Sequence, residues 1–173
     1  MAVLVRSIGL SMGMPERDLK IVEQAATLHD IGKIGVTENI LRKPGELTGQ
    51  EYEMVKKHSL IGAEILSPVK FLKEVVPLVK YHHEHIDGSG YPEGLKGDNI
   101  PLGAKIIALA DSVDAMLSER PYARAKSLGT ISYELKRVSG TQLDSALVHN
   151  FLNNNLLNEF VLKNKYDGVC DKY

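Results

Sequence analysis

The amino-acid sequence predicts an all-α fold in a single domain. Apolar residues recur at helical spacing in several segments, and no stretch alternates between apolar and polar residues as a half-buried strand would. The chain has 173 residues, of which 43% are hydrophobic and 25% are charged. This is enough apolar material for one well-formed core. We therefore expect a bundle of helices joined by loops, without internal repeats.

The first two helices are expected in the N-terminal thirty residues. Residues 2–13 form an apolar segment that we interpret as a short first helix. Pro15 suits the first turn of the second helix, because its ring fixes φ and its missing N–H has no helical partner there. This second helix is expected to reach about Ile31, since one face is continuously apolar: Ile21, Val22, Ala25, Ala26 and Leu28.

Two further helices are expected before residue 84. Thr48 is followed three residues later by Glu51, which is the pattern of a capping box. We expect this box to open a helix over residues 48–66. Another helix is expected over residues 68–83, with a kink at Pro77, because proline in a helix interior removes a hydrogen bond and clashes with the preceding turn.

The second half of the chain begins with a long loop. Residues 86–100 contain four glycines and a proline, which favour turns over helix. Pro101 then opens a strongly apolar helix, and Ser127 and Asp144 are suitable N-caps for the last two helices. The apolar face of the helix after Pro101 comprises Ile106, Ile107, Leu109, Ala110, Val113, Met116 and Leu117.

Composition excludes several classes of protein. The net charge of −1 argues against a broad surface for DNA or RNA. A single cysteine, Cys170, excludes an intramolecular disulfide and fits a reducing compartment. No apolar run has the length of a membrane span, and the N-terminus lacks the pattern of a signal peptide. We therefore expect a cytoplasmic protein in which this segment contacts neither DNA nor a membrane.

Most of the candidate histidines and aspartates lie near the ends of the expected helices. His29–Asp30 ends the second helix, His58 lies within the third, and His82–His83 ends the fourth. Asp111 lies in the middle of the apolar helix, where an unpaired carboxylate would be costly to bury. Neighbouring helical residues point about 100° apart, so each adjacent pair suits two ions side by side. Two such ions, roughly 3.5–4 Å apart, can share a bridging carboxylate.

The donor types favour a transition metal. Imidazole combined with carboxylate suits iron, manganese, zinc, nickel or cobalt rather than calcium. An alternative remains open at this point. Each histidine could be a core residue whose polar atoms are hydrogen-bonded, and Asp111 could pair with a lysine or cap a helix end. His85 and His149 have no assigned role, and His149 is expected on the surface.

The motifs resemble one known family. The segments "HDIGKIGV", "KPGELTGQEYEMVKKH", "HHEHIDGSGYPEGLKGDNIP", "AKIIALADSVDAMLSERPYARA" and "GTQLDSALVHNFL" occur in this order. Together they resemble the HD-GYP family, a branch of the HD-domain metal-dependent phosphohydrolases. The similarity covers residues 1–153 and implies a helical bundle of the HD-domain type whose first helix is truncated. Residues 154–173 are expected to form the end of the last helix and a tail.

The resemblance implies hydrolysis of the bacterial second messenger cyclic di-GMP, to pGpG or on to GMP, by water activated between metal ions. It implies a bi- or trinuclear site that holds two or three divalent ions. Iron and manganese are the usual metals of the family, and zinc, nickel and cobalt also suit the donors. The residues that match the family's metal ligands by position are His29, Asp30, His58, His82, His83 and Asp111.

The resemblance also implies residues for catalysis and substrate binding. Asp30 and Lys33 match catalytic positions, and Lys33 would contact the scissile phosphate or the nearby water. Arg120 matches a residue that holds a substrate phosphate. The family usually has a basic residue directly after "RPY", whereas here Ala123 stands at that position. Arg124 follows one place later and is a further candidate for substrate binding.

Two more departures from the family pattern concern ligand number and substrate contact. The family usually has a further ligand about thirty residues before the HD pair, a position that falls ahead of Met1. After "HHE" the family usually has arginine, whereas this chain has His85.

Three functions are therefore compared. The first is a cyclic di-GMP phosphodiesterase, and the second is a hydrolase of a related cyclic dinucleotide. The third is a non-catalytic receptor or docking module whose Gly90-Tyr91-Pro92 loop meets a diguanylate cyclase domain.

Overall fold

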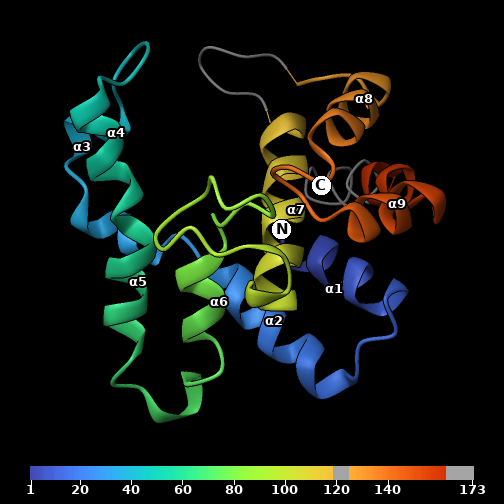
Figure 1. The fold of residues 1–173 in the computed structure, drawn as a ribbon, viewed down its shortest axis with the longest axis horizontal. Coiled ribbons are helices and arrows are strands. Elements are labelled where there is room, and N and C mark those ends of the chain that lie inside the picture. Colours follow the sequence, from blue (N-terminus) through green and yellow to red (C-terminus); the bar gives the residue numbers. More distant parts are fainter. Residues whose placement is uncertain (119–124, 163–173) are drawn as a thin grey trace, which may run out of the picture.

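The computed structural model describes residues 1–118 and 125–162, and these residues form helices and turns without a named strand (Figure 1). The named α-helices are α1 (Ala2–Ser11), α2 (Glu16–Leu28), α3 (Glu38–Leu41), α4 (Gly49–Lys56), α5 (His58–Leu66), α6 (Val76–Tyr81), α7 (Leu102–Leu117), α8 (Leu128–Val138) and α9 (Ser145–Asn153), and residues 156–162 are also helical. Three short 3-10 helices are η1 (Ile31–Gly35), η2 (Lys70–Leu72) and η3 (Gly97–Asn99). The all-α prediction is confirmed.

Helix α7 lies at the centre of the bundle. Helices α1, α2, α6 and α9 pack around it (Figure 1). Most of its apolar face is completely buried, including Ile106, Ile107, Leu109 and Val113. Burying these side chains is the main favourable contribution to folding, at about 1.5–3 kcal/mol for each large apolar side chain. Helix α7 therefore provides a rigid support for any polar side chain on its remaining face.

Helices α3, α4 and α5 form a flank on one side of this bundle (Figure 1). Helix α5 packs against α6 and against η1, which directly follows α2. The contact between η1 and α5 is so close that a Cβ on Gly32 would lie 1.9 Å from the carbonyl oxygen of His58 and 2.5 Å from the nitrogen of Gly62. This contact brings the C-terminal end of α2 beside the start of α5.

Several predicted helix ends are confirmed. The side chain of Thr48 accepts a hydrogen bond from the Glu51 amide, and the Glu51 carboxylate accepts one from the Thr48 amide, as a capping box requires. Ser127 and Asp144 cap α8 and α9 through their side-chain oxygens. Pro101 occupies the position just before α7. These signals depend on a few neighbouring residues, which explains why the sequence alone reveals them.

Three helix predictions were wrong in detail. The helix expected over residues 48–66 is divided at Lys57, where the amide bonds the Met54 carbonyl and the turn tightens. The helix expected over residues 68–83 is replaced by η2 and α6. Pro77 lies in the first turn of α6 rather than at a kink, because a proline is tolerated where the helix needs no N–H. The second helix was expected to reach Ile31, but α2 ends at Leu28, and η1 begins at Ile31.

The predicted loop over residues 86–100 is confirmed, apart from the single turn η3. It connects α6 to α7 and lies across the region between α5 and α7 (Figure 1). Its amides at Ile86 and Asp87 donate to the turn between α8 and α9. Lys105 on α7 holds its far end by an ion pair with Asp98 at 3.3 Å. No helix in the described part of the chain is long and apolar enough to cross a membrane.

Candidate metal centre

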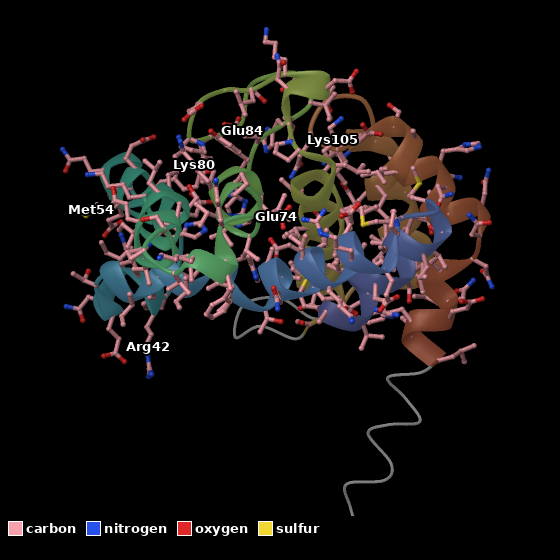
Figure 2. All side chains as sticks on the ribbon, turned by 90° about the horizontal axis from the view of Figure 1, so that it is seen from below. Arg42, Met54, Glu74, Lys80, Glu84 and Lys105 are labelled. Atoms are coloured by element: carbon pink, nitrogen blue, oxygen red, sulfur yellow. The ribbon has the colours of Figure 1, made fainter. Side chains whose placement is uncertain are left out.

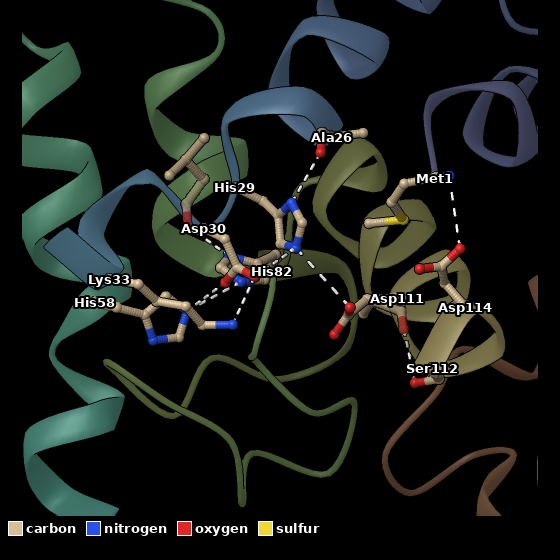
Figure 3. Close-up of polar contacts among 12 residues, drawn as sticks. Met1, Ala26, His29, Asp30, Lys33, His58, His82, Asp111, Ser112 and Asp114 are labelled. Atoms are coloured by element: carbon tan, nitrogen blue, oxygen red, sulfur yellow. Dashed lines mark hydrogen bonds and ion pairs between the residues drawn. The ribbon is translucent and has the colours of Figure 1, made fainter. Parts of the chain in front are cut away.

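Side chains from four helices converge at the C-terminal ends of α2 and α6 (Figure 3). Two groups of possible ligands are present, and within each group the ligand atoms all lie within 4.8 Å of one another. His58, His82 and His83 form one group, and His29, Asp30 and His82 form the other. His82 belongs to both groups. The six residues that the sequence singled out thus include five that gather into two adjacent sets.

Short distances connect the two groups. The Nε2 atoms of His58 and His82 are 3.4 Å apart, and His58 Nε2 lies 3.6 Å from Asp30 Oδ1. Asp111 approaches from α7, with its Oδ1 3.9 Å from His29 Nε2 (Figure 3). The predicted convergence of the six side chains is therefore present in the fold.

Three imidazole rings are oriented in the same way. In each, Nδ1 lies at hydrogen-bond distance from the backbone carbonyl three residues earlier, and Nε2 faces the cluster. A carbonyl can only accept, so Nδ1 carries the proton and Nε2 presents a lone pair. Such a bond from the second ring nitrogen is typical of histidines that bind metals. The three bonds are His29 to Ala26 at 2.8 Å, His58 to Val55 at 2.7 Å and His82 to Val79 at 2.7 Å.

Burial keeps His58, His82 and His83, the inner histidine group, neutral. It lowers the pKa of His82 to about 3 and lowers the pKa values of His58 and His83 as well. The backbone carbonyls oppose this shift at His58 and His82 without reversing it. At neutral pH these rings are therefore in the form that coordinates a metal.

The two facing nitrogens provide a test of whether a cation fits. His58 Nε2 and His82 Nε2 are both lone-pair donors, so neither has a hydrogen to give across the 3.4 Å between them. A divalent cation that binds both nitrogens would relieve this repulsion. Together with the carboxylates of Asp30 and Asp111, the nitrogens form a mixed N/O donor set that suits transition metals.

Asp30 is held as a carboxylate beside Lys33. Burial alone would raise the pKa of Asp30, but the hydrogen bond from Lys33 and the positive charge of that ammonium help to outweigh it, and the net pKa is lowered. The Lys33 ammonium lies 2.6 Å from Asp30 Oδ2, and its side chain is 42% exposed. Lys33 is therefore at the rim of the cluster, where it can also reach a ligand in the solvent.

The expected burial of Asp111 was wrong. We expected this carboxylate to lie among buried residues, because α7 is strongly apolar. Its side chain is instead 37% exposed. The apolar residues of α7 cover only the faces that meet other helices, and Asp111 lies on the remaining face toward His29. A half-exposed carboxylate needs less compensation than a buried one.

Tyr91 of the Gly-Tyr-Pro segment borders the site. Its ring stacks on His83, with centroids 4.8 Å apart and planes inclined by 30°. Lys56 lies over the same ring at 5.7 Å. Burial raises the pKa of the Tyr91 hydroxyl above its usual range, so it stays protonated. The loop therefore contributes an aromatic wall next to the inner histidine group.

The remaining candidates take other places. Arg120 and Arg124 lie outside the described residues. His85 bonds Ser89 at 2.9 Å within the loop. His149 is exposed on α9 and bonds Asn153, as its predicted surface position implies.

One residue near the site had no role in the sequence analysis. Glu84 follows His83 directly and is only 3% exposed. Its place after the paired histidines was the available signal, but its partners are nine to eleven residues away and could not be deduced from local spacing.

Comparisons with known proteins identify the family. The family model for the HD domain matches residues 1–147. A cyclic di-GMP phosphodiesterase of Thermotoga maritima is 46% identical over 149 residues, which cover 84% of this chain and 40% of that protein. A 3'3'-cGAMP-specific phosphodiesterase of Vibrio cholerae is 37% identical over 138 residues, covering 79% of this chain and 26% of that protein. The chain thus spans less than half the length of these relatives.

A solved structure supports the same architecture. The HDG"Y"P protein Bd1817 of Bdellovibrio bacteriovorus matches with a TM-score of 0.72 at 18% identity, over 92% of this chain and 49% of that one. At this identity the match concerns the fold alone. The similarity to the HD-GYP phosphodiesterases is confirmed by the relatives, and the chain belongs to the HD-domain family.

Proposed function

We propose that this chain catalyses the metal-dependent hydrolysis of a phosphodiester bond in cyclic di-GMP. The observation that carries the proposal is the pair of ligand groups that share His82, on a chain 46% identical to a cyclic di-GMP phosphodiesterase. The product would be pGpG or GMP.

The proposed ligands of two or three divalent ions are His29, Asp30, His58, His82, His83 and Asp111. Iron or manganese is proposed, since mixed imidazole and carboxylate donors suit both. When bound, such ions neutralise the phosphodiester and lower the pKa of water near it. The chain's own contribution is to supply neutral imidazoles and ionised carboxylates at neutral pH, as the pKa shifts of His82 and Asp30 favour.

Lys33 is proposed to contact the substrate phosphate. Its ammonium bonds Asp30 and is nearly half exposed, so a short movement would direct it to a non-bridging oxygen. A positive charge at that point stabilises the negative charge that develops during hydrolysis. Arg120 and Arg124 are proposed to bind the substrate's other phosphate, where a planar guanidinium can donate two parallel hydrogen bonds.

The test uses purified protein loaded with Fe²⁺ or Mn²⁺ under anaerobic conditions, with cyclic di-GMP consumption followed by chromatography. We expect turnover in the wild type and none in Asp30→Ala or Asp111→Asn. Asp114→Asn is the matched control, because Asp114 lies one turn further along α7 and pairs with the N-terminal amine rather than with the cluster. A metal-loaded wild type no more active than Asp30→Ala would contradict the proposal.

A second substrate is favoured by a specific observation. The 37% identity to a 3'3'-cGAMP-specific phosphodiesterase is close to the level shared with several cyclic di-GMP enzymes. The assay should therefore include both cyclic dinucleotides side by side. A higher kcat/KM for 3'3'-cGAMP would assign the chain to that substrate.

The non-catalytic alternative predicts a different metal content. Fewer than one tightly bound ion per chain after reconstitution would favour a receptor or docking module. The contact of the Gly90-Tyr91-Pro92 loop with a diguanylate cyclase domain stays a prediction. It can be tested by measuring whether Tyr91→Ala weakens binding of that partner.

A further inference from the structure

Glu84 is a buried carboxylate whose hydrogen bonds all go to one loop. It is 3% exposed and lies where the loop after α6 begins (Figure 2). Its Oε1 accepts from the amides of Glu93 at 2.7 Å and Gly94 at 3.1 Å, and its Oε2 accepts from the amide of Leu95 at 3.0 Å. Bonds from backbone amides to an ionised carboxylate are stronger than those between neutral groups. They therefore fix residues 93–95 against the end of α6.

The same loop is held close to the end of α6 at its Gly-Tyr-Pro segment. The Tyr91 amide donates to the carbonyl of His83 at 3.1 Å. A Cβ on Gly90 would lie 2.2 Å from the amide nitrogen of His85, so only glycine permits this approach. These contacts, together with those of Glu84, place the Tyr91 ring on the His83 imidazole.

His83 is oriented differently from the other histidines of the cluster. His29, His58 and His82 each bond a backbone carbonyl three residues earlier. Among the described residues no such bond orients His83. Its ring instead contacts other rings, with His82 at 4.0 Å, Tyr91 stacked at 4.8 Å and His58 edge-on at 5.0 Å. The orientation of this ligand therefore depends on where the loop holds Tyr91.

We propose that Glu84 is a positioning residue for the metal centre, acting through the loop and Tyr91 on the His83 ring. It does not touch a ligand atom, and its effect is to keep the loop in the one arrangement that stacks Tyr91 on His83. The inference rests on the proposed metal site. Its test uses metal binding and amide exchange without any nucleotide, so its failure is distinguishable from a failure of the hydrolase proposal.

The first experiment compares Glu84→Gln with the wild type. Glutamine has nearly the same volume, but its NH₂ group cannot accept a bond from an amide. We expect the amides of residues 93–95 to exchange hydrogen at least tenfold faster, as measured by mass spectrometry. We expect Mn²⁺ affinity, followed by the EPR signal of free Mn²⁺, to fall about 10-fold to 100-fold, the usual effect of losing an outer-shell partner.

Glu93→Gln is the matched control. Glu93 lies in the same loop, and its exposed side chain pairs with Lys80, while only its backbone amide meets Glu84. We expect this variant to bind Mn²⁺ and to exchange its amides like the wild type. A loss of Mn²⁺ affinity in Glu93→Gln equal to that in Glu84→Gln would overturn the assignment to Glu84.

The second experiment tests the route through Tyr91. We expect Tyr91→Leu to lower Mn²⁺ affinity while leaving the slow exchange of residues 93–95 intact, which separates the ring from the loop even if a Glu84 variant fails to fold. The double variant Glu84→Gln/Tyr91→Leu should lose no more Mn²⁺ affinity than whichever single variant loses more. Fast exchange with unchanged Mn²⁺ affinity in Glu84→Gln, unchanged affinity in Tyr91→Leu, or additive losses would each overturn the inference. A wild type that binds Mn²⁺ but hydrolyses nothing would contradict the function alone.

Discussion

The contact between η1 and α5 leads to the most demanding prediction, the effect of Gly32→Ala. A methyl group at this position would lie 1.9 Å from the His58 oxygen, 2.5 Å from the Gly62 nitrogen and 2.8 Å from the His58 carbonyl carbon. Ordinary contacts between carbon atoms lie at about 3.5–4.0 Å. Because all three neighbours are backbone atoms, no side chain can rotate away, and η1 must withdraw from α5 by more than about 1 Å.

This withdrawal would affect both stability and the metal centre. Overpacking typically costs 1–3 kcal/mol and occasionally more. Since the clash here is with backbone, we expect Gly32→Ala to lower the free energy of unfolding by about 3 kcal/mol. Asp30 and Lys33 flank this position, so their distance from His58 would increase. We therefore also expect Mn²⁺ affinity to fall at least tenfold.

Urea denaturation followed by circular dichroism measures the first effect, and Mn²⁺ titration measures the second. The matched control is Gly49→Ala, where a methyl group would meet nothing within 4 Å at the start of α4. We expect that variant to be as stable as the wild type or up to about 1 kcal/mol more stable, since alanine lowers the entropy of the unfolded chain. A Gly32→Ala protein within about 0.5 kcal/mol of the wild type would refute the close packing of η1 on α5.

Three further predictions follow from individual contacts. Thr48→Ala should lower the free energy of unfolding in urea by about 1 kcal/mol, whereas Thr37→Ala should have little effect, because Thr37 makes no side-chain bond at the start of α3. Lys33→Met should reduce cyclic di-GMP turnover about 100-fold or more while Mn²⁺ still binds, since a donor to the reacting phosphate is lost. In metal-free protein, stability should fall as pH drops from about 6.5 toward 3, and His82 alone should contribute roughly 1 kcal/mol of this loss by pH 5.5. In that window the unfolded chain protonates His82 and the folded chain does not, and His82→Gln should reduce the slope in urea titrations at several pH values.

Local signals predicted much of the fold. The capping box at Thr48, the caps at Ser127 and Asp144 and the apolar run after Pro101 each depend on a few adjacent residues, and all four are present. The division at Lys57 was missed because no residue there is a helix breaker. It follows from the need to fit η1 against α5, which is a contact between segments about thirty residues apart.

The site was predicted as a set of residues rather than as a geometry. Histidines and aspartates within and at the ends of the expected helices indicated a shared centre, and the family pattern selected six of them. The spacing did not indicate that Asp111 would be half exposed, because an apolar helix gives no direct sign of which face its neighbours leave open. Nor did it indicate that Glu84 would hold the loop, since three amides that follow a cluster of glycines have no signature in the sequence.

The unexpected division at Lys57 also explains how His58 can serve the site. The last carbonyls of a helix lack partners within that helix. Ala26, Val55 and Val79 lie in the last turns of α2, α4 and α6, and the ring that follows each by three residues uses its carbonyl. The Val55 carbonyl also accepts from a backbone amide at the end of α4, and because a carbonyl oxygen has two lone pairs it can accept from the His58 ring as well. Ending α4 at Lys56 therefore gives His58 the same orienting contact as His29 and His82, so that three helix ends direct three Nε2 atoms toward one centre.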